Sequence, residues 1–412
     1  MIVENMYPRD SRVRKEANTL VNEGYDVSVI ALRGDGEPHR ETVDGVSVFR
    51  IPKLEMFRKT VSKKGADSKK NTSLVGAITG YFSEHIYFTT MSFIFSLYIW
   101  MKYGLDIIHV HNPPDTLVFI GAFYKGFKKK YIFDHHDLSP ELYKIRCRAK
   151  SDVVYRSLML LEKFSCVLAD CVIATNESYK DIESQRHNIS PNKIKIVRND
   201  PIEDESNGYR SDCTATDKHK RQLLFVGSIN PQDGVDILLE ALHILVYEIL
   251  ERNFVCNILG DGDSLADLRR VSEKLGLDDY VDFKGYVNDR ELVWEFLCKA
   301  DIGVEPAPDN ELNRNSTFIK VMEYMAAGKP VVAFDLRETR YSLDGGGVLV
   351  SDCTREDFAR AVKRTLDDLG LRERLGKVGR ARVKKDLNWA VASSNLLKAY
   401  SCLCNEAPSR ES

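Results

Sequence analysis

Lys320 and Glu323 are three residues apart in the segment NSTFIKVMEYMAAGKPVV, which spans residues 315–332. In a helix this spacing puts a cation and a carboxylate close to one face, where both can reach the same ligand. Asn315, Ser316 and Thr317 offer side-chain oxygens where that helix would begin, and a helix start binds anions. A nucleotide sugar matches this arrangement, with its diphosphate at the helix start and Lys320 and its ribose at Glu323. A capped surface helix with an ordinary Lys/Glu pair explains the spacing equally simply, and spacing alone favours it.

Histidines and acids follow two predicted strands in the first half of the chain. His111 comes after the strand 106–110, in HVHNPPDTL, and DHHDLSPEL follows the strand 131–133. Because parallel strands bind ligands at their carboxyl ends, His111 is well placed for chemistry, although a lone histidine is more often structural. His136, Asp137 and Glu141 could orient or deprotonate an acceptor hydroxyl, or could equally cap the next helix.

The loop YPRDSRV places Arg9 and Arg12 at the mouth of the first predicted helix, over residues 13–21. A phosphate contact is one interpretation, and solvated loop arginines are the favoured one.

Glycine turns follow the predicted strands of the second half. Gly227 and Gly234 flank a predicted helix start in GSINPQDGVDILLEAL, Gly260 lies in NILGDG, and Gly285 lies in VDFKGYV. Such glycines let the main chain approach a diphosphate closely. A single turn of this kind is weak evidence.

Length and composition describe an ordinary globular chain. The 412 residues suit two or three domains, and a net charge of −2 gives no general attraction to nucleic acid. The nine cysteines show no zinc-type spacing, and the first residues lack a signal sequence, so we expect a cytoplasmic protein without metal or disulfide framework.

Strands and helices alternate twice along the chain, which predicts an α/β protein with two Rossmann-like, doubly wound domains facing a cleft. We expect an acceptor-side domain over 1–205, a linker over 206–220, a nucleotide-sugar domain over 221–388, and a last helix and tail over 389–412 that return to the first domain. Gly328 and Pro330 predict the end of the 320s helix just before a strand.

A basic stretch over 53–70 precedes an aromatic segment over 86–100. The aromatic segment has fewer continuous apolar residues than a helix needs to span a bilayer. Together they could lie on an anionic membrane surface. A buried crossover helix behind a solvated loop is the favoured alternative.

The segment around Glu323 resembles the signature of family 4 glycosyltransferases, which are retaining enzymes of the GT-B fold. Glu323, Met325-Ala326, Gly328 and Pro330-Val331 match the second half of that signature, whereas Asn315 stands where the family usually has its first Glu. The resemblance implies a ribose contact for Glu323 and a hexose contact, as an amide, for Asn315. The first loop resembles a bacterial polysaccharide or O-antigen-type subgroup.

The same resemblance implies roles for other residues. His111 would lie beside the donor sugar, and Gly285, Tyr286 and Val287 against the nucleotide base. Ser228 and Asp233 stand where the family usually has two diphosphate-binding cations. The diphosphate contact would then fall to Lys320 and the helix start, with Arg314 as a further candidate.

We therefore predict retaining transfer of a sugar from a nucleoside diphosphate, with UDP the expected carrier, to a hydroxyl of a lipid-linked glycan during cell-surface polysaccharide synthesis. No cofactor, metal or nucleic acid is expected, and peripheral contact with the inner face of the cell membrane is a further expectation. The alternatives are a sugar-nucleotide epimerase of the same fold and a degenerate GT-B subunit that binds without catalysis.

Overall fold

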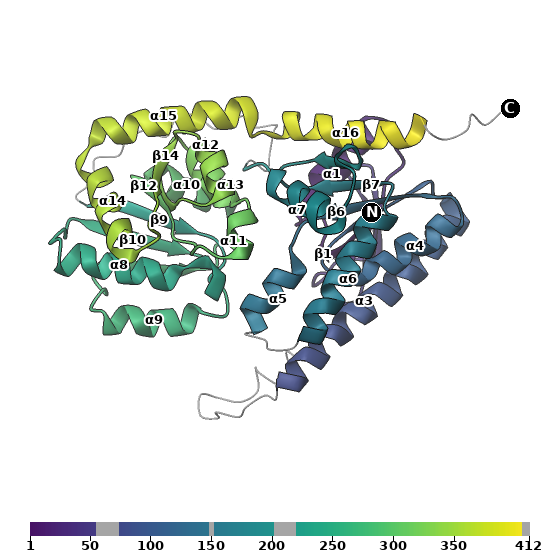
Figure 1. Cartoon of the computed structure of the whole chain (residues 1–412), viewed down its shortest axis with the longest axis horizontal. Helices are drawn as coiled ribbons and strands as arrows, with labels where there is room; N and C mark the ends of the chain where they lie inside the picture. Colours follow the sequence, from purple (N-terminus) through teal and green to yellow (C-terminus); the bar gives the residue numbers. More distant parts are fainter. Residues whose placement is uncertain (55–73, 148–151, 202–219, 406–412) are drawn as a thin grey trace. The chain divides into compact units, whose positions relative to one another are not determined.

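The computed structural model describes residues 1–54, 74–147, 152–201 and 220–405, which form two compact units (Figure 1). Among these residues, the first unit contains 1–140, 152–197 and 393–405, and the second contains 141–147, 198–201 and 220–392. Apart from their outermost residues, the predicted basic stretch over 53–70 and the predicted linker over 206–220 lie outside the described residues.

A sheet of eight strands forms the centre of the first unit, in the order β3-β4-β2-β1-β5-β6-β7-β8. Its strands are β1 Ile2–Met6, β2 Ser28–Leu32, β3 Arg40–Val43, β4 Val46–Ile51, β5 Ile107–His111, β6 Lys130–His135, β7 Cys171–Ala174 and β8 Ile194–Ile196. All neighbours pair in parallel except β3 with β4. The strand order reverses between β1 and β5, and such a point binds ligands in open α/β sheets. His111 is the last residue of β5.

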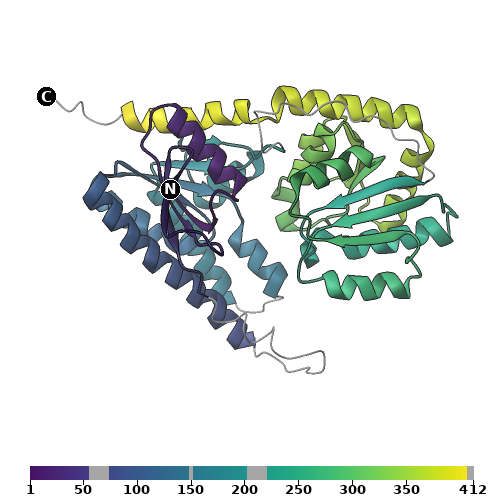
Figure 2. The same ribbon diagram turned by 180° about the vertical axis from the view of Figure 1, so that it is seen from behind.

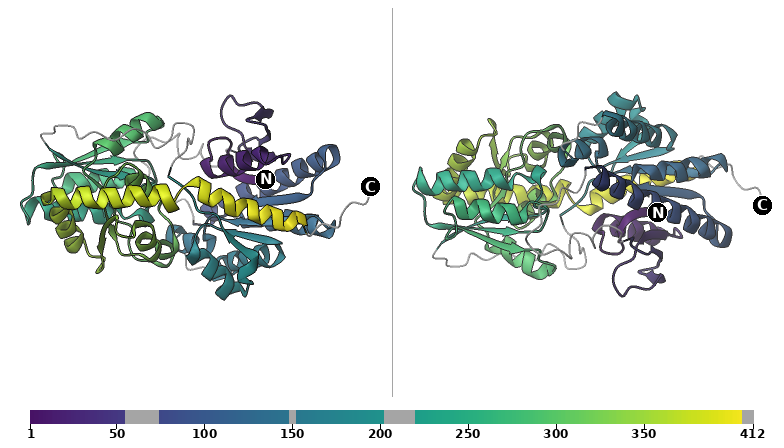
Figure 3. Two further views of the ribbon diagram at one scale, coloured as in Figure 1. Left: turned by 90° about the horizontal axis from the view of Figure 1, so that it is seen from above. Right: turned by 90° about the horizontal axis from the view of Figure 1, so that it is seen from below.

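Helices cover both faces of this sheet (Figures 1 and 2). They are α1 Ser11–Asn22, α3 Leu74–Tyr103, α4 Val118–Gly126, α6 Asp152–Leu168, α7 Glu177–His187 and α16 Trp389–Asn405. Helix α5 Ser139–Cys147 begins in the first unit, but from Glu141 onward it belongs to the second. From Ser393 onward α16 belongs to the first unit, along which it runs in the view from above (Figure 3). There the Tyr400 hydroxyl lies 2.9 Å from Nδ1 of His109.

Helix α3 contains the aromatic segment predicted over residues 86–100, and extends it at both ends to 30 residues. The favoured expectation of a buried helix is only half correct, because Phe88 and Ile99 are buried while Ile94 and Met101 are exposed. No helix among the described residues is long and apolar enough to cross a bilayer.

The second unit contains an entirely parallel sheet in the order β11-β10-β9-β12-β13-β14. Its strands are β9 Arg221–Val226, β10 Phe254–Leu259, β11 Val281–Gly285, β12 Ile302–Glu305, β13 Val331–Phe334 and β14 Gly347–Val350. Counted within the unit, this order is 3-2-1-4-5-6, the arrangement of a dinucleotide-binding sheet. The prediction of two doubly wound α/β domains is therefore confirmed.

Alternating side chains of the central strand β9 explain how helices pack on both faces of this sheet. Leu223 and Phe225 join the core beneath α8 and α14, whereas Leu224 joins the core beneath α10, α12 and α15. The helices of the unit are α8 Val235–Tyr247, α9 Leu265–Lys274, α10 Arg290–Lys299, α11 Glu311–Asn315, α12 Ile319–Ala326, α13 Arg337–Leu343, α14 Arg355–Asp367 and α15 Leu369–Asp386. Cys298 of α10 is disulfide-bonded. The sequence had led us to expect no disulfide framework.

Candidate active site

The strand order of the second unit reverses between β9 and β12. Gly227 follows β9, and Glu305 is the last residue of β12. Helix α12 brings Lys320 to the same point, where its Nζ lies 3.1 Å from Oε2 of Glu305 and 4.3 Å from the centre of the Phe225 ring. The predicted cation therefore sits at the ligand-binding end of the sheet.

Glu305 is a partner that the sequence analysis did not single out. It is almost completely buried, and its Oε1 accepts a hydrogen bond from the main-chain N–H of Ala307 at 3.1 Å. Burial raises the pKa of Glu305, and the nearby Lys320 opposes that rise. An acidic residue that directly ends an apolar predicted strand is the signal that could have identified it.

The predicted glycines allow the turns near Lys320 to pack closely. Gly227 has φ of +142°, and a Cβ on it would lie 2.9 Å from Cε of Lys320. Gly260 has φ of +151°, and its Cβ would lie 1.8 Å from the main-chain oxygen of Gly227. A Cβ on Gly234 would lie 2.1 Å from the main-chain oxygen of Pro306. The turns after β9, β10 and β12 therefore pack too closely for side chains at these three positions.

The loop between β9 and α8 carries no cation at the two positions noted in the sequence. Ser228 is exposed. Asp233 closes a short helical turn, where its carboxylate accepts a hydrogen bond from the N–H of Asn230 at 3.0 Å. The other oxygen of Asp233 lies 3.9 Å from Nζ of Lys320. A diphosphate at this loop would therefore have Lys320 beside it, together with one acidic neighbour.

The predicted helix start at residues 315–317 is wrong in position. Asn315 ends the short helix α11, and α12 begins at Ile319 after the N-cap Phe318. The reason is local, because the Ser316 hydroxyl donates back to the main-chain oxygen of Leu312 at 2.8 Å and thus completes the preceding helix. Since Phe318 supplies no side-chain cap, the first N–H groups of α12 receive no hydrogen bond from that residue. Thr317 lies between the two helices.

The remaining donor-side predictions occupy separate positions around α12. The Asn315 amide donates to the main-chain oxygen of Glu311 at 2.6 Å. Glu323 lies one turn after Lys320, and its Oε1 is 3.8 Å from Nη1 of Arg290 on α10, a cation that the sequence analysis missed. Arg314 is exposed and forms an ion pair with Asp309.

The segment predicted to contact the base lies between β11 and α10. Gly285 ends β11 with φ of +71°, and its main-chain oxygen accepts a hydrogen bond from the N–H of Gly260 at 2.8 Å. Tyr286 is 72% exposed, and Val287 follows it. This segment therefore adjoins the glycine turns and offers an exposed ring beside them.

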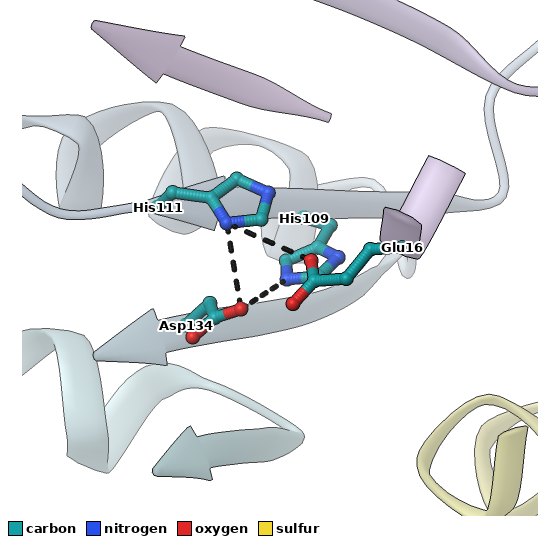
Figure 4. A group of neighbouring side chains, drawn as sticks. All are labelled: Glu16, His109, His111 and Asp134. Carbon is teal, nitrogen blue, oxygen red and sulfur yellow. Dashed lines mark ion pairs between the residues drawn. The ribbon is translucent and has the colours of Figure 1, made fainter. Parts of the chain in front are cut away.

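In the first unit, His111 belongs to a buried group of ionisable side chains at the ends of β5 and β6 (Figure 4). Its Nδ1 lies 3.4 Å from Oδ2 of Asp134 and 3.2 Å from Nε2 of His136. The ring of His109 stacks on that of His111 at 4.3 Å, with its Nε2 3.6 Å from the same Asp134 oxygen. Because His111 has no exposed surface, contact with a sugar would require the surrounding side chains to rearrange.

Arg12 connects the members of this group. Its Nη2 donates to both carboxylate oxygens of Asp134, at 2.9 and 3.0 Å, and its Nε donates to Nε2 of His136 at 2.8 Å. Nε also lies 3.1 Å from Oε1 of Glu16. The favoured interpretation of a solvated loop arginine is therefore wrong for Arg12, because α1 begins at Ser11 and turns Arg12 and Glu16 toward the sheet. Arg9, by contrast, is exposed.

Burial controls the protonation of this group. Burial raises the pKa of Glu16 well above its ordinary value, and the neighbouring Asp134 raises it further. Burial likewise lowers the pKa of His111 well below its ordinary value. It would also raise the pKa of Asp134, but Arg12 and His136 outweigh it and lower this pKa well below its ordinary value. Asp134 is therefore the carboxylate that most strongly balances Arg12, whereas burial favours the neutral forms of Glu16 and His111.

The same side chains form a possible ligand set for a metal. Atoms of Glu16, His109, His111 and Asp134 all lie within 4.8 Å of one another. Histidine and carboxylate ligands suit Zn²⁺. However, Arg12 already places a positive charge against both carboxyl groups, which opposes the binding of a cation there. The expectation of a protein without metal stays a prediction.

Two predicted acceptor-side residues lie outside this group. Asp137 is exposed, and its main-chain N–H and oxygen bond the side chain of Asn112, at 3.3 and 2.8 Å. Glu141 is buried in the first turn of α5 and belongs to the second unit. The structure therefore brings Arg12, His111 and His136 together, but not Asp137 or Glu141.

Comparison with protein-family models assigns both parts of the chain. Residues 11–199 match the model described as Glycosyltransferase Family 4, and residues 220–368 match the model described as Glycosyl transferases group 1. The chain belongs to these glycosyltransferases. An uncharacterized glycosyltransferase of Methanocaldococcus jannaschii is 25% identical over 403 residues, which are 93% of this chain and 91% of the relative.

Solved structures show that this glycosyltransferase has the fold of GT-B enzymes. Sucrose-phosphate synthase from Thermosynechococcus elongatus matches with a TM-score of 0.71 at 19% identity, covering 98% of this chain and 95% of the other. HepE from Anabaena, in complex with UDP, matches with a TM-score of 0.65 at 14% identity, covering 97% and 98%. At these identities the likeness shows the fold alone.

Proposed function

We propose that the protein transfers a sugar, with retention at the anomeric carbon, from a nucleoside diphosphate to a hydroxyl of a glycan. The observation that carries this proposal is the position of Lys320, which lies beside close-packed glycine turns at the reversal point of the second sheet, with Glu323 one turn further along α12. A cation beside glycine turns at a helix start suits a diphosphate, and a carboxylate one turn away suits ribose hydroxyls.

In this mechanism Lys320 and the N–H groups at the start of α12 stabilise the negative charge that develops on the leaving diphosphate. The departing phosphate oxygen takes the proton of the incoming hydroxyl on the same face of the sugar, and the proposed reaction uses no metal ion. Asn315 contacts the hexose, and His111 assists at the reacting centre once the side chains around it have moved. The base lies against Gly285, Tyr286 and Val287.

UDP is the proposed carrier, because the related fold of HepE was determined with UDP. The proposed acceptor is a lipid-linked glycan of cell-surface polysaccharide synthesis, met at the inner face of the cell membrane. Arg12 and His136 are the proposed acceptor-side residues in the first unit, with Asp137 and Glu141 as further candidates.

Release of nucleoside diphosphate from UDP-, GDP- and ADP-sugars tests the proposal, with glycan acceptors present and absent. Lys320→Ala should reduce release at least about tenfold, the usual cost of removing a charge-stabilising donor. The matched control is Lys299→Ala, because Lys299 is a half-exposed lysine of the same unit. Conversion of the donor sugar without acceptor would indicate an epimerase. A protein that binds nucleotide but releases no diphosphate from any donor would be the binding subunit, for which the acidic Asp233 beside Lys320 is the supporting observation.

A further inference from the structure

The outer surface of α3, α4 and α6 in the first unit is apolar in a way that packing among the described residues does not explain. The three helices form one layer over the sheet (Figure 1). Rings join α3 to α4, with Phe93 4.8 Å from Phe123 and Trp100 5.5 Å from Tyr124, and α4 in turn contacts α6. Side chains that point away from the sheet on each helix therefore share one outer face.

On α3 this outer face is an apolar stripe that the exposed Thr90 interrupts between Ile86 and Ile94. Ile86, Ile94, Tyr98 and Met101 are exposed at helical spacing, and Met101 reaches 79%. The opposite side of the same helix is also apolar and buried, for example at Phe88. A helix that packs on one side of a globular unit usually carries polar residues on the other. Helix α3 does not follow that pattern.

Helices α4 and α6 continue the stripe. Phe119 of α4 is 62% exposed, and Phe127 directly after α4 is 52% exposed. On α6, the exposed apolar residues again follow helical spacing: they are Val153, Leu160, Phe164 and Val167. Contiguous exposed apolar surface of this kind marks a site of interaction.

Basic residues accompany these apolar side chains. Lys102 ends the stripe of α3, Lys128 follows Phe127, and Arg156 and Lys163 lie among the apolar residues of α6, all four of them exposed. The acidic residue exposed on α6 is Asp152, at its first position. Apolar and aromatic side chains that enter the headgroup region, with lysine and arginine reaching the phosphates, are the composition of a protein surface that binds anionic lipid.

We propose that the outer face of α3, α4 and α6 docks on an anionic lipid bilayer. The charge of the face selects this partner, because a second copy of the chain would bring the same basic residues against each other. This proposal concerns the first unit and does not depend on the donor site of the second. Nucleotide binding is therefore measured for each variant, so that a failure of membrane docking can be distinguished from a failure of the donor site.

Sedimentation of the full chain with vesicles tests the proposal. The protein should bind vesicles of phosphatidylcholine mixed with phosphatidylglycerol more strongly than vesicles of phosphatidylcholine alone. The double variant Leu160→Asp/Phe164→Asp should bind at least about tenfold more weakly, because it removes apolar area that the bilayer would bury and adds negative charge. The control is Leu369→Asp, which changes a leucine of similar exposure in the second unit and should bind as the unchanged protein does. A second variant, Arg156→Glu/Lys163→Glu, should abolish the preference for phosphatidylglycerol.

Three outcomes would overturn the proposal. They are the absence of vesicle binding, unchanged binding by the Leu160→Asp/Phe164→Asp variant, and a concentration-dependent dimer, seen by light scattering, that this variant abolishes while vesicles remain unbound. The last would assign the face to a second copy of the chain. Thermal unfolding of each variant checks that the substitutions at these exposed positions leave the unit folded.

Discussion

The ammonium nitrogen of Lys320 lies 3.1 Å from a carboxylate oxygen of Glu305, and both side chains are largely buried. A buried charge without a partner is strongly destabilising, so Glu305 balances Lys320 while no anion is bound. A bound diphosphate could supply the same negative charge. The pair therefore links the stability of the second unit to occupation of its donor site.

Glu305→Gln should lower the melting temperature, because it leaves the Lys320 charge without its carboxylate. Breaking a fully buried pair costs about 3–5 kcal/mol, and we expect the lower end because Asp233 remains 3.9 Å from Nζ of Lys320. UDP should raise the melting temperature of this variant more than that of the unchanged protein. The check is a thermal unfolding series with and without UDP, and equal UDP-induced shifts in the two proteins would contradict the linkage.

Gly227→Ala should weaken nucleotide binding. The new Cβ would lie 2.9 Å from Cε of Lys320 and would displace that side chain, at a residue with φ of +142°. Gly345→Ala is the matched control, because Gly345 also has positive φ, at +90°, but its Cβ would meet its nearest atom only at 3.7 Å. Calorimetry should show affinity for UDP at least about tenfold lower in the first variant and unchanged in the second, although both lose roughly 1 kcal/mol of stability through backbone strain.

Asp134→Asn should change the state of His111 and lower the stability of the first unit, because Arg12 loses the carboxylate that balances its charge. At present the carboxylate of Asp134, 3.4 Å from Nδ1, can accept a hydrogen bond from it, whereas the lone pair of His136 Nε2 is already taken by Arg12. Asp134 therefore favours the tautomer protonated at Nδ1. Ring-nitrogen NMR of histidine-labelled protein should report this neutral tautomer at pH 7, with His111→Gln providing the assignment. In the Asp134→Asn variant the His111 signals should shift, and the transfer rate should fall at least about tenfold with KM for the donor unchanged. Unchanged ring signals would refute this role of Asp134.

Stability of the first unit should fall as the pH rises from 7 toward 10. His135 Nδ1 lies 2.9 Å from Oε1 of Glu183, and Nε2 lies 3.7 Å from Oε2 of Glu162. Burial opposes the charge on His135, but hydrogen bonds and attraction from Glu162 and Glu183 raise its pKa to about 10. Because the unfolded value is about 6.5, this stabilisation is complete below pH 6.5 and is lost as the pH rises through 10.

Denaturant unfolding at several pH values tests this prediction. For each pH unit, the free energy of unfolding should fall by up to about 1.4 kcal/mol more in the unchanged protein than in His135→Gln. The comparison of slopes, rather than of absolute stabilities, removes the contributions of lysines and tyrosines that titrate in both proteins. Parallel slopes would count against a charged His135.

Local signals in the sequence predicted the end of α12 but not its start. Gly328 has φ of +70°, and its N–H donates to the main-chain oxygen of Met325, as expected for a glycine that closes a helix. At the other end, three polar residues each looked like a cap, and the helix begins two residues after the last of them. The competing hydrogen bond from Ser316 back to Leu312 decides the position, and it depends on a preceding helix that the sequence analysis did not predict.

Partners that meet through the fold were not predictable from local spacing. Arg12 and Asp134 are 122 positions apart in the chain and form two hydrogen bonds, so neither residue identifies the other. Glu305 and Lys320 likewise meet because β12 ends, and α12 begins, at the same edge of the sheet. The pattern of strands and helices predicted the sheets, whereas the buried charges depended on which side chains those sheets bring together.

The most direct test of the account is calorimetric titration of UDP, GDP and ADP into the unchanged protein and into Glu323→Ala, with Glu295→Ala as a control for loss of a half-exposed glutamate in the same unit. We expect one nucleotide, UDP, to bind with a dissociation constant on the order of micromolar. Glu323→Ala should weaken it at least about tenfold, because hydrogen bonds to a charged group contribute about 1.5–3 kcal/mol each. Failure of all three nucleotides to bind, or equal affinity in the unchanged and Glu323→Ala proteins, would contradict a donor site at α12.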